Sequence, residues 1–70
     1  MFIVIELQET AQELHHIATV HAALREAESQ YHTVLSAAAQ SAVPVHAAVL
    51  LSGSGTVLKS ECYTNAGQLQ

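Results

Sequence analysis

The chain has 70 residues, of which 50% are hydrophobic and 11% charged, and its formal net charge is −4. It is too apolar to be a disordered chain, and with only two basic residues it lacks the positive surface that duplex nucleic acids require. A single core of this size rarely supplies more than about 3–5 kcal/mol. We therefore expect one domain over residues 1–70 that forms a homo-oligomer and does not bind duplex nucleic acid.

The N-terminal apolar run, residues 1–7, is too short to span a membrane. It also lacks the basic start of a signal peptide, because the first basic residue is Arg25. Cys62 is the single cysteine, so no internal disulfide forms, and a free thiol is typical of a reducing compartment. These features predict a cytoplasmic protein that has no membrane partner.

The N-terminal third of the chain contains one clear strand and one ambiguous segment. Residues 2–7 are apolar and mostly β-branched, which favours a strand, and residues 8–13 are a polar connection. Residues 14–22 fit either a strand or the start of a helix that runs over residues 10–40, because periodicity does not separate the two. A helix of that length is unusual in so small a domain, so we favour a strand over about residues 15–21.

The clearest helix is predicted for residues 23–41, which are rich in Ala, Glu, Gln and Leu. Pro44 prevents its continuation and favours an extended backbone at Val43. The helix carries an apolar stripe at helical spacing, made of Leu24, Ala27, Tyr31, Val34, Leu35 and Ala38.

A hairpin is predicted to follow. Residues 45–51 form a strand, residues 52–55 supply glycines for a tight turn, and residues 56–64 return antiparallel. Residues 65–70 are expected to be a flexible tail. The predicted fold class is α+β, a small antiparallel sheet with one helix on one face. Its order is ββαββ, or βαββ if residues 10–40 are one helix.

One helix can cover only one face of the sheet. From strand alternation we expect Val45, Val49 and Leu51 to lie under the helix, with Cys62 packed on the same side. The uncovered face would then be a mixed surface, typical of an oligomer interface or a ligand pocket, with Phe2, Val4, His46, Leu50, Val57, Lys59, Glu61 and Tyr63. The residues assigned to an interface are Phe2, Val4, Leu50, Val57 and, from the helix, Tyr31.

No catalytic or metal motif accompanies these elements. The five histidines (15, 16, 21, 32 and 46) occur without a CxxC, an HExxH or a helical i, i+4 histidine pair. The turn at residues 52–55 lacks the Lys-Ser/Thr ending of a phosphate loop and precedes a strand. We expect no enzyme activity, no metal and no cofactor.

A small anionic ligand is the remaining chemical hypothesis. Arg25 and Lys59 are the only cationic side chains that are always charged, and His46 and Tyr63 share the predicted uncovered face with Lys59. These four residues are the predicted ligand-binding set. For His46 the alternative is a hydrogen-bonded interface histidine, and for Arg25 it is a solvated side chain.

Several short patterns in the chain resemble a group of very small proteins encoded by phages and prophages of gram-positive gut bacteria. The resemblance lies in the opening FIVIE and in AExxYH…LxAAA…VPxHA…LL…KxECY, and it covers most of residues 1–6 and 26–63. The resemblance implies a strand before the helix, and it implies a phage-encoded protein located in the cytoplasm of a host cell. It does not imply any biochemical activity.

Taken together, these features favour a small phage-encoded oligomeric binding protein that sequesters a host nucleotide immune signal. The alternatives are a non-enzymatic structural or assembly accessory and an inhibitor that docks on a protein partner.

Overall fold

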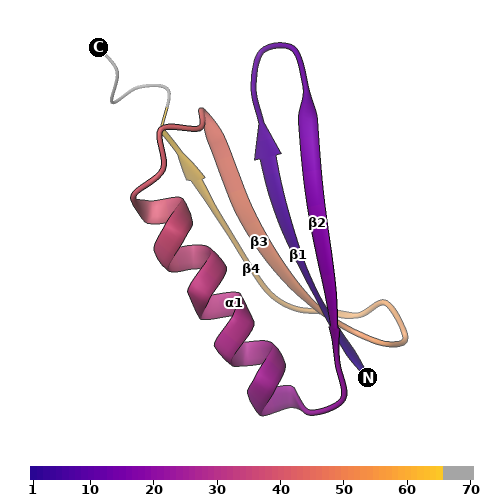
Figure 1. The fold of residues 1–70 in the computed structure, drawn as a ribbon. Coiled ribbons are helices and arrows are strands. Elements are labelled where there is room, and N and C mark those ends of the chain that lie inside the picture. The colour runs from indigo at the N-terminus through magenta and orange to yellow at the C-terminus, as the bar shows by residue number, and fades with distance from the viewer. Residues whose placement is uncertain (66–70) are drawn as a thin grey trace.

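The computed structural model describes residues 1–65 and shows a four-stranded antiparallel sheet with one helix packed on it (Figure 1). The sheet order is β2-β1-β3-β4. The elements follow the chain in the order β1 (Phe2–Glu9), β2 (Leu14–His21), α1 (Leu24–Ala39), β3 (Val45–Ser52) and β4 (Val57–Thr64). This confirms the predicted α+β fold and its ββαββ order.

The ambiguous segment before the helix is a strand. Residues Leu14–His21 pair antiparallel with β1 over their whole length, so a single helix over residues 10–40 is wrong. β1 also continues to Glu9, two residues beyond the predicted end, because Gln8 and Glu9 pair with β2 on one side and β3 on the other. Between the strands, Thr10 closes the turn by accepting the backbone N–H of Glu13 on its side-chain oxygen at 3.1 Å.

The helix packs on the sheet through a narrow stripe. Its buried residues are Ala27, Tyr31, Val34 and Ala38, which recur at the spacing of one helix face. Tyr31 contributes the largest fully buried side chain, and the two alanines let the helix approach the strands closely. The residues of the sheet that complete this core are Val4, Ala48 and Leu50, with Phe2 and Leu35 partly buried beside them.

The predicted assignment of the two sheet faces is wrong. His46, Ala48 and Leu50 lie under α1, and the strand partners of these three residues on β4 are Tyr63, Glu61 and Lys59. The set Val45, Val49 and Leu51 therefore lies on the opposite, uncovered face. The small side chain of Ala48 lies in the same core as Tyr31 and leaves room for the helix at close range.

The turn between β3 and β4 depends on two glycines, as the sequence predicts. Gly55 has a φ of 92°, a conformation that other residues rarely adopt. Gly53 donates its N–H to the carbonyl of Met1 at 2.8 Å, and a Cβ there would lie 3.1 Å from that oxygen. Just before this turn the pairing with β4 shifts register, so Leu50 lies opposite Lys59 and Leu51 opposite Val57.

Asn65, the first residue after β4, is held in place by hydrogen bonds. Asn65 is 3% exposed, and its side chain donates to the carbonyl of Val43 at 2.8 Å. Its backbone N–H donates to the carbonyl of Pro44 at 2.7 Å. The predicted flexible tail therefore does not include Asn65, and its other residues, 66–70, lie outside the described part of the chain.

Candidate functional site

The side of the sheet that faces away from α1 is the most distinctive surface of the protein, and we call it the open face. Strand pairing fixes its members, because residues directly opposite one another on neighbouring strands point to the same side. The open face consists of Ile3, Ile5, Leu7 and Glu9 (β1), Leu14, His16, Ala18 and Val20 (β2), Val45, Ala47, Val49 and Leu51 (β3), and Val57, Ser60, Cys62 and Thr64 (β4).

Most of the open face is apolar, and its centre carries no charge. The two central strands contribute aliphatic side chains alone, apart from Glu9 at one end of β1. At the edges Leu14, Val20 and Val57 are 60%, 61% and 55% exposed. Helix α1 lies on the other side of the sheet (Figure 1), so none of the described elements covers this surface. Contiguous apolar patches of this kind mark interaction sites on soluble proteins.

The helix-covered face, by contrast, contains a buried polar cluster at one end. The Nε2 of His46 lies 2.6 Å from a carboxylate oxygen of Glu6, and Gln8 donates to the same oxygen at 3.1 Å. His46 is 4% exposed, and its Nδ1 has no hydrogen-bond partner among the described residues. Glu6 is 18% exposed, so water reaches only one side of the pair. These contacts join β1 to β3 beneath the helix and leave no space for a ligand between them.

A second polar contact ties the helix to the edge strand. The Nζ of Lys59 on β4 donates to Glu28 of α1 at 2.9 Å. This hydrogen bond and the charge of Lys59 lower the pKa of the Glu28 carboxyl. Nearby, burial raises the pKa of the Tyr31 hydroxyl, and the negative charge of Glu61 raises it further. The ion pair links α1 to β4, and it gives Lys59 an acidic partner within the chain.

The four predicted ligand-binding residues do not form one site in the chain. Arg25 is exposed in the first turn of α1, and Lys59 is paired with Glu28. His46 is buried under the helix, and Tyr63, its partner across the strands, is 37% exposed. Nucleotide binding therefore stays a prediction, and the four residues do not assemble a pocket for it within residues 1–65.

The predicted interface residues are also separated. Val4, Leu50 and Tyr31 are 1%, 0% and 2% exposed in the chain's own core, so they are not available at a surface. Phe2 packs against that core, and Val57 alone of the five lies on the open face. The prediction that Cys62 packs toward the helix is wrong as well: Cys62 is exposed on the open face, opposite Ala47.

Three of the other four histidines make local contacts. His15 pairs with Glu13 at 2.5 Å, His21 bonds Thr19 at 2.8 Å, and the ring of His32 meets Tyr31 edge-on. Within residues 1–65, no group of three or more His, Cys, Asp or Glu side chains is arranged to hold a metal ion. In the same range, the helix falls short of the length and apolar character that crossing a membrane requires.

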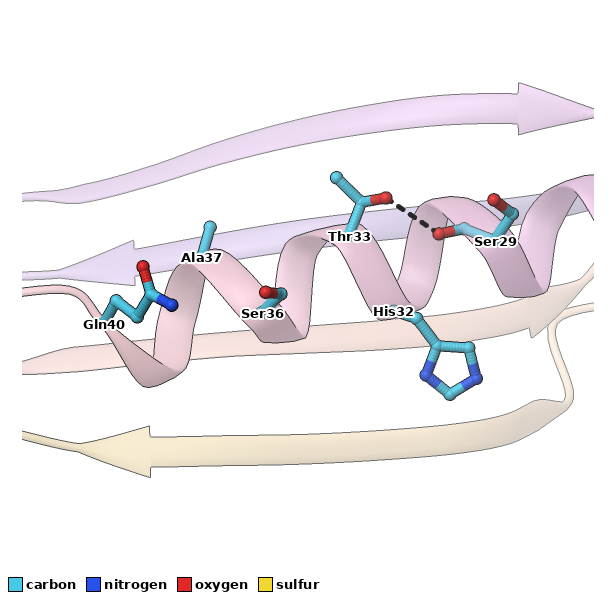
Figure 2. A pocket seen from close by; sticks show the side chains of 6 residues that line it. All are labelled: Ser29, His32, Thr33, Ser36, Ala37 and Gln40. Carbon is cyan, nitrogen blue, oxygen red and sulfur yellow. Dashed lines mark hydrogen bonds between the residues drawn. The ribbon is translucent and has the colours of Figure 1, made fainter.

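A shallow hollow on the outer surface of α1 is not an enclosed site. Figure 2 shows its six lining side chains projecting from this one helix, with no second element opposite them. Thr33 uses its hydroxyl to donate to the carbonyl of Ser29 at 3.0 Å, within the helix. A ligand held there would remain in water on most sides. The lining residues are Ser29, His32, Thr33, Ser36, Ala37 and Gln40.

Comparison of the chain with protein-family models, curated proteins and solved structures finds no match. Sequence reasoning found the surplus of apolar strand surface but misplaced it. Small residues do not identify the covered side of β3 from the sequence, because one set contains Ala48 and the other contains Ala47.

Proposed function

We propose that this protein is a non-enzymatic binding protein. It binds a partner through its open face, and this face is covered by the partner in the functional state. The observation that carries the proposal is the uncharged aliphatic centre of the open face, built from Ile3, Ile5 and Leu7 of β1 and their neighbours on β3. An antiparallel sheet with a solvated face normally alternates to polar side chains on that face. β1 and β3 do not, so water is not the expected neighbour of this surface.

The energetics of burial support a binding role. At about 25 cal/mol per Å², removing roughly 400 Å² of apolar surface from water yields about 10 kcal/mol before the entropic cost of association is subtracted. That gross value falls within the roughly 4–15 kcal/mol that association costs, so apolar burial can offset much of this cost without a charged anchor. In this proposal the polar groups of the helix-covered face stabilise the fold and do not contact the partner.

The location of polar groups in the described chain supports a non-enzymatic role. The two histidine–carboxylate contacts are His15–Glu13, exposed at the hairpin, and His46–Glu6, buried under the helix. Neither lies beside a nucleophile in a pocket, which is the arrangement that covalent or acid–base catalysis requires. Binding through the open face uses neither pair.

Cys62 provides a direct test, because its thiol lies on the open face and it is the single cysteine. We expect it to react with a maleimide at least tenfold more slowly in the native protein than in urea, in purified protein or in unfractionated lysate. The matched control moves the thiol to the outer side of α1, as Cys62→Ser with Ser36→Cys, where it should react at close to the unfolded rate. If native Cys62 reacts as fast as this control in both settings, the open face is bare and the proposal is overturned.

A further inference from the structure

We propose that the occupant of the open face is a second copy of this chain, packed sheet against sheet to give four layers in the order helix, sheet, sheet, helix. The inference rests on the proposed function and adds the identity of the partner. Two aligned antiparallel sheets of the same twist pack face to face at about −30° with their side chains interdigitated. Because both partners would present the same surface, the contact would be isologous and closed at two subunits.

The size of the open face suits such a pair. Four strands of 8 residues each, at about 4.8 Å between strands and 3.3 Å per residue, give a plan area of roughly 500 Å². Two copies together would bury about 1,000 Å² or more, since side chains add relief, and this reaches the lower bound for a specific interface. A peptide or a small molecule would cover only part of it.

The placement of charge favours a like partner in spite of the net charge of −4. Glu6 and Glu61 point to the helix-covered side of the sheet, and Glu26 and Glu28 belong to α1. Glu9 is the one acidic residue in the face, and it lies at the end of β1. Two acidic chains can therefore meet through this surface without placing like charges opposite each other in its apolar centre.

The polar residues of the open face lie at its edges, and its centre is apolar. Its apolar centre lies on β1 and β3, and β4 at one edge contributes Ser60, Cys62 and Thr64. The β2 edge adds His16 and is otherwise apolar, so the polar rim that specific interfaces carry is present on the β4 side.

The open face has to be shielded from water whenever the chain is present, and this also favours self-association. Apolar strands left in water are an aggregation hazard whenever the chain is present. A second copy is the one partner that is always present with the chain. It would also double the core that so small a domain builds on its own.

Two isoleucines offer a matched test of the arrangement. Ile5 lies in the middle of the open face, whereas Ile17 is 56% exposed on the opposite side of the sheet. We expect the wild-type protein to have twice the 7.4 kDa chain mass by light scattering. Ile5→Lys should reduce the mass to that of one chain, and Ile17→Lys should leave the pair intact. A wild-type mass of one chain at every concentration, or a pair that Ile5→Lys does not dissociate, overturns the inference.

The Ile5→Lys variant must remain folded for its mass to be informative, so far-ultraviolet circular dichroism is recorded for both variants. If Ile5→Lys unfolds, Val20→Lys replaces it, since Val20 is 61% exposed at the β2 edge of the same face. It should weaken the pair at least tenfold, and an unchanged dissociation constant overturns the inference. The maleimide assay separates the two proposals. A single-chain mass with Cys62 protected in lysate overturns the second copy and retains binding, whereas a pair with freely reactive Cys62 overturns both.

Discussion

The two faces of the sheet differ in the opposite sense from most small α+β proteins. The face under α1 contains the buried cluster Glu6, Gln8 and His46 at one end, whereas the open face has an aliphatic centre without a charged side chain. In an ordinary two-layer domain the polar groups of the sheet face water. The difference teaches that the open face has the composition of an interior surface, which supports the proposal that a partner covers it.

The largest expected effect compares two adjacent leucines. Leu50→Ala removes a fully buried side chain from the helix-covered core and should cost about 2–5 kcal/mol, enough to unfold a domain of this size. Leu51→Ala, one position along, shortens a side chain of the open face, where we propose that a partner packs. Its loss of stability relative to the wild type should grow with protein concentration toward a plateau, because association stabilises the tighter-binding wild type more by mass action. Urea unfolding at several protein concentrations measures both.

If Leu50→Ala and Leu51→Ala lose the same unfolding free energy at every protein concentration, the distinction between the covered face and the open face is contradicted.

The buried pair on the helix-covered face gives the next effect. Glu6→Leu leaves both ring nitrogens of His46 unpaired under the helix and should cost about 1–3 kcal/mol. The double variant Glu6→Leu with His46→Leu removes both polar partners, and it should be more stable than the single variant. Urea unfolding at one fixed protein concentration compares the three proteins. A double variant less stable than Glu6→Leu would contradict the cost assigned to the unpaired His46 ring.

Tyr31 makes the covered face sensitive to alkaline pH. Its pKa is raised above the usual 10.0 by burial and by Glu61, so the unfolded chain loses this proton more readily than the folded one. The stability that the folded protein gains from keeping the Tyr31 hydroxyl protonated is fully present below pH 10.0. It is lost as the pH rises through the pKa of Tyr31 in the folded state. In a Tyr63→Phe variant, phenolate absorbance should report Tyr31 alone, with a midpoint above that of the same variant in urea. Coincident midpoints while the chain is folded would contradict the burial of this ring.

The smallest expected effect concerns the exposed ion pair between Glu28 and Lys59. Because Lys59 lowers the pKa of Glu28, the pair stabilises the fold above pH 4.5 and ceases to do so as the pH falls through the lower folded value. Glu28→Gln should flatten this part of the acid limb of thermal stability and leave association unchanged. Glu26→Gln is the control, since no ion pair of Glu26 occurs in the described chain. An identical acid limb in wild type and Glu28→Gln would contradict the effect of the pair.

The order of elements was predictable because local signals coincide with it. Pro44 ends the helix region, Gly53 and Gly55 form a turn, and β-branched residues mark the strands. The end of β1 was missed, because Gln8 and Glu9 are polar and are held in the strand by pairing on both sides. Such pairing is a property of the whole sheet and leaves no local trace in the sequence.

The open face was predictable as a surplus of apolar strand but not in its membership. Alternation divides β3 into one set with His46 and Leu50 and another with Val45 and Val49, and both sets are largely apolar. Hydrophobicity alone therefore does not select the face that the helix covers. That choice depends on side-chain volume at Ala48 beneath Tyr31 and on the Glu6–His46 pair, both of which require the fold to be known.

Asn65 has a consequence for the order in which the sheet opens. β4 is an edge strand with exposed side chains along its length, the kind of strand that separates first in local unfolding. Its two ends are nevertheless fastened, one by the turn at Gly53 and the other by the two hydrogen bonds of Asn65 to the segment after the helix. Opening must therefore begin within the strand. Both fastenings raise the kinetic barrier to strand exchange between neighbouring copies, the route by which edge strands start fibrils.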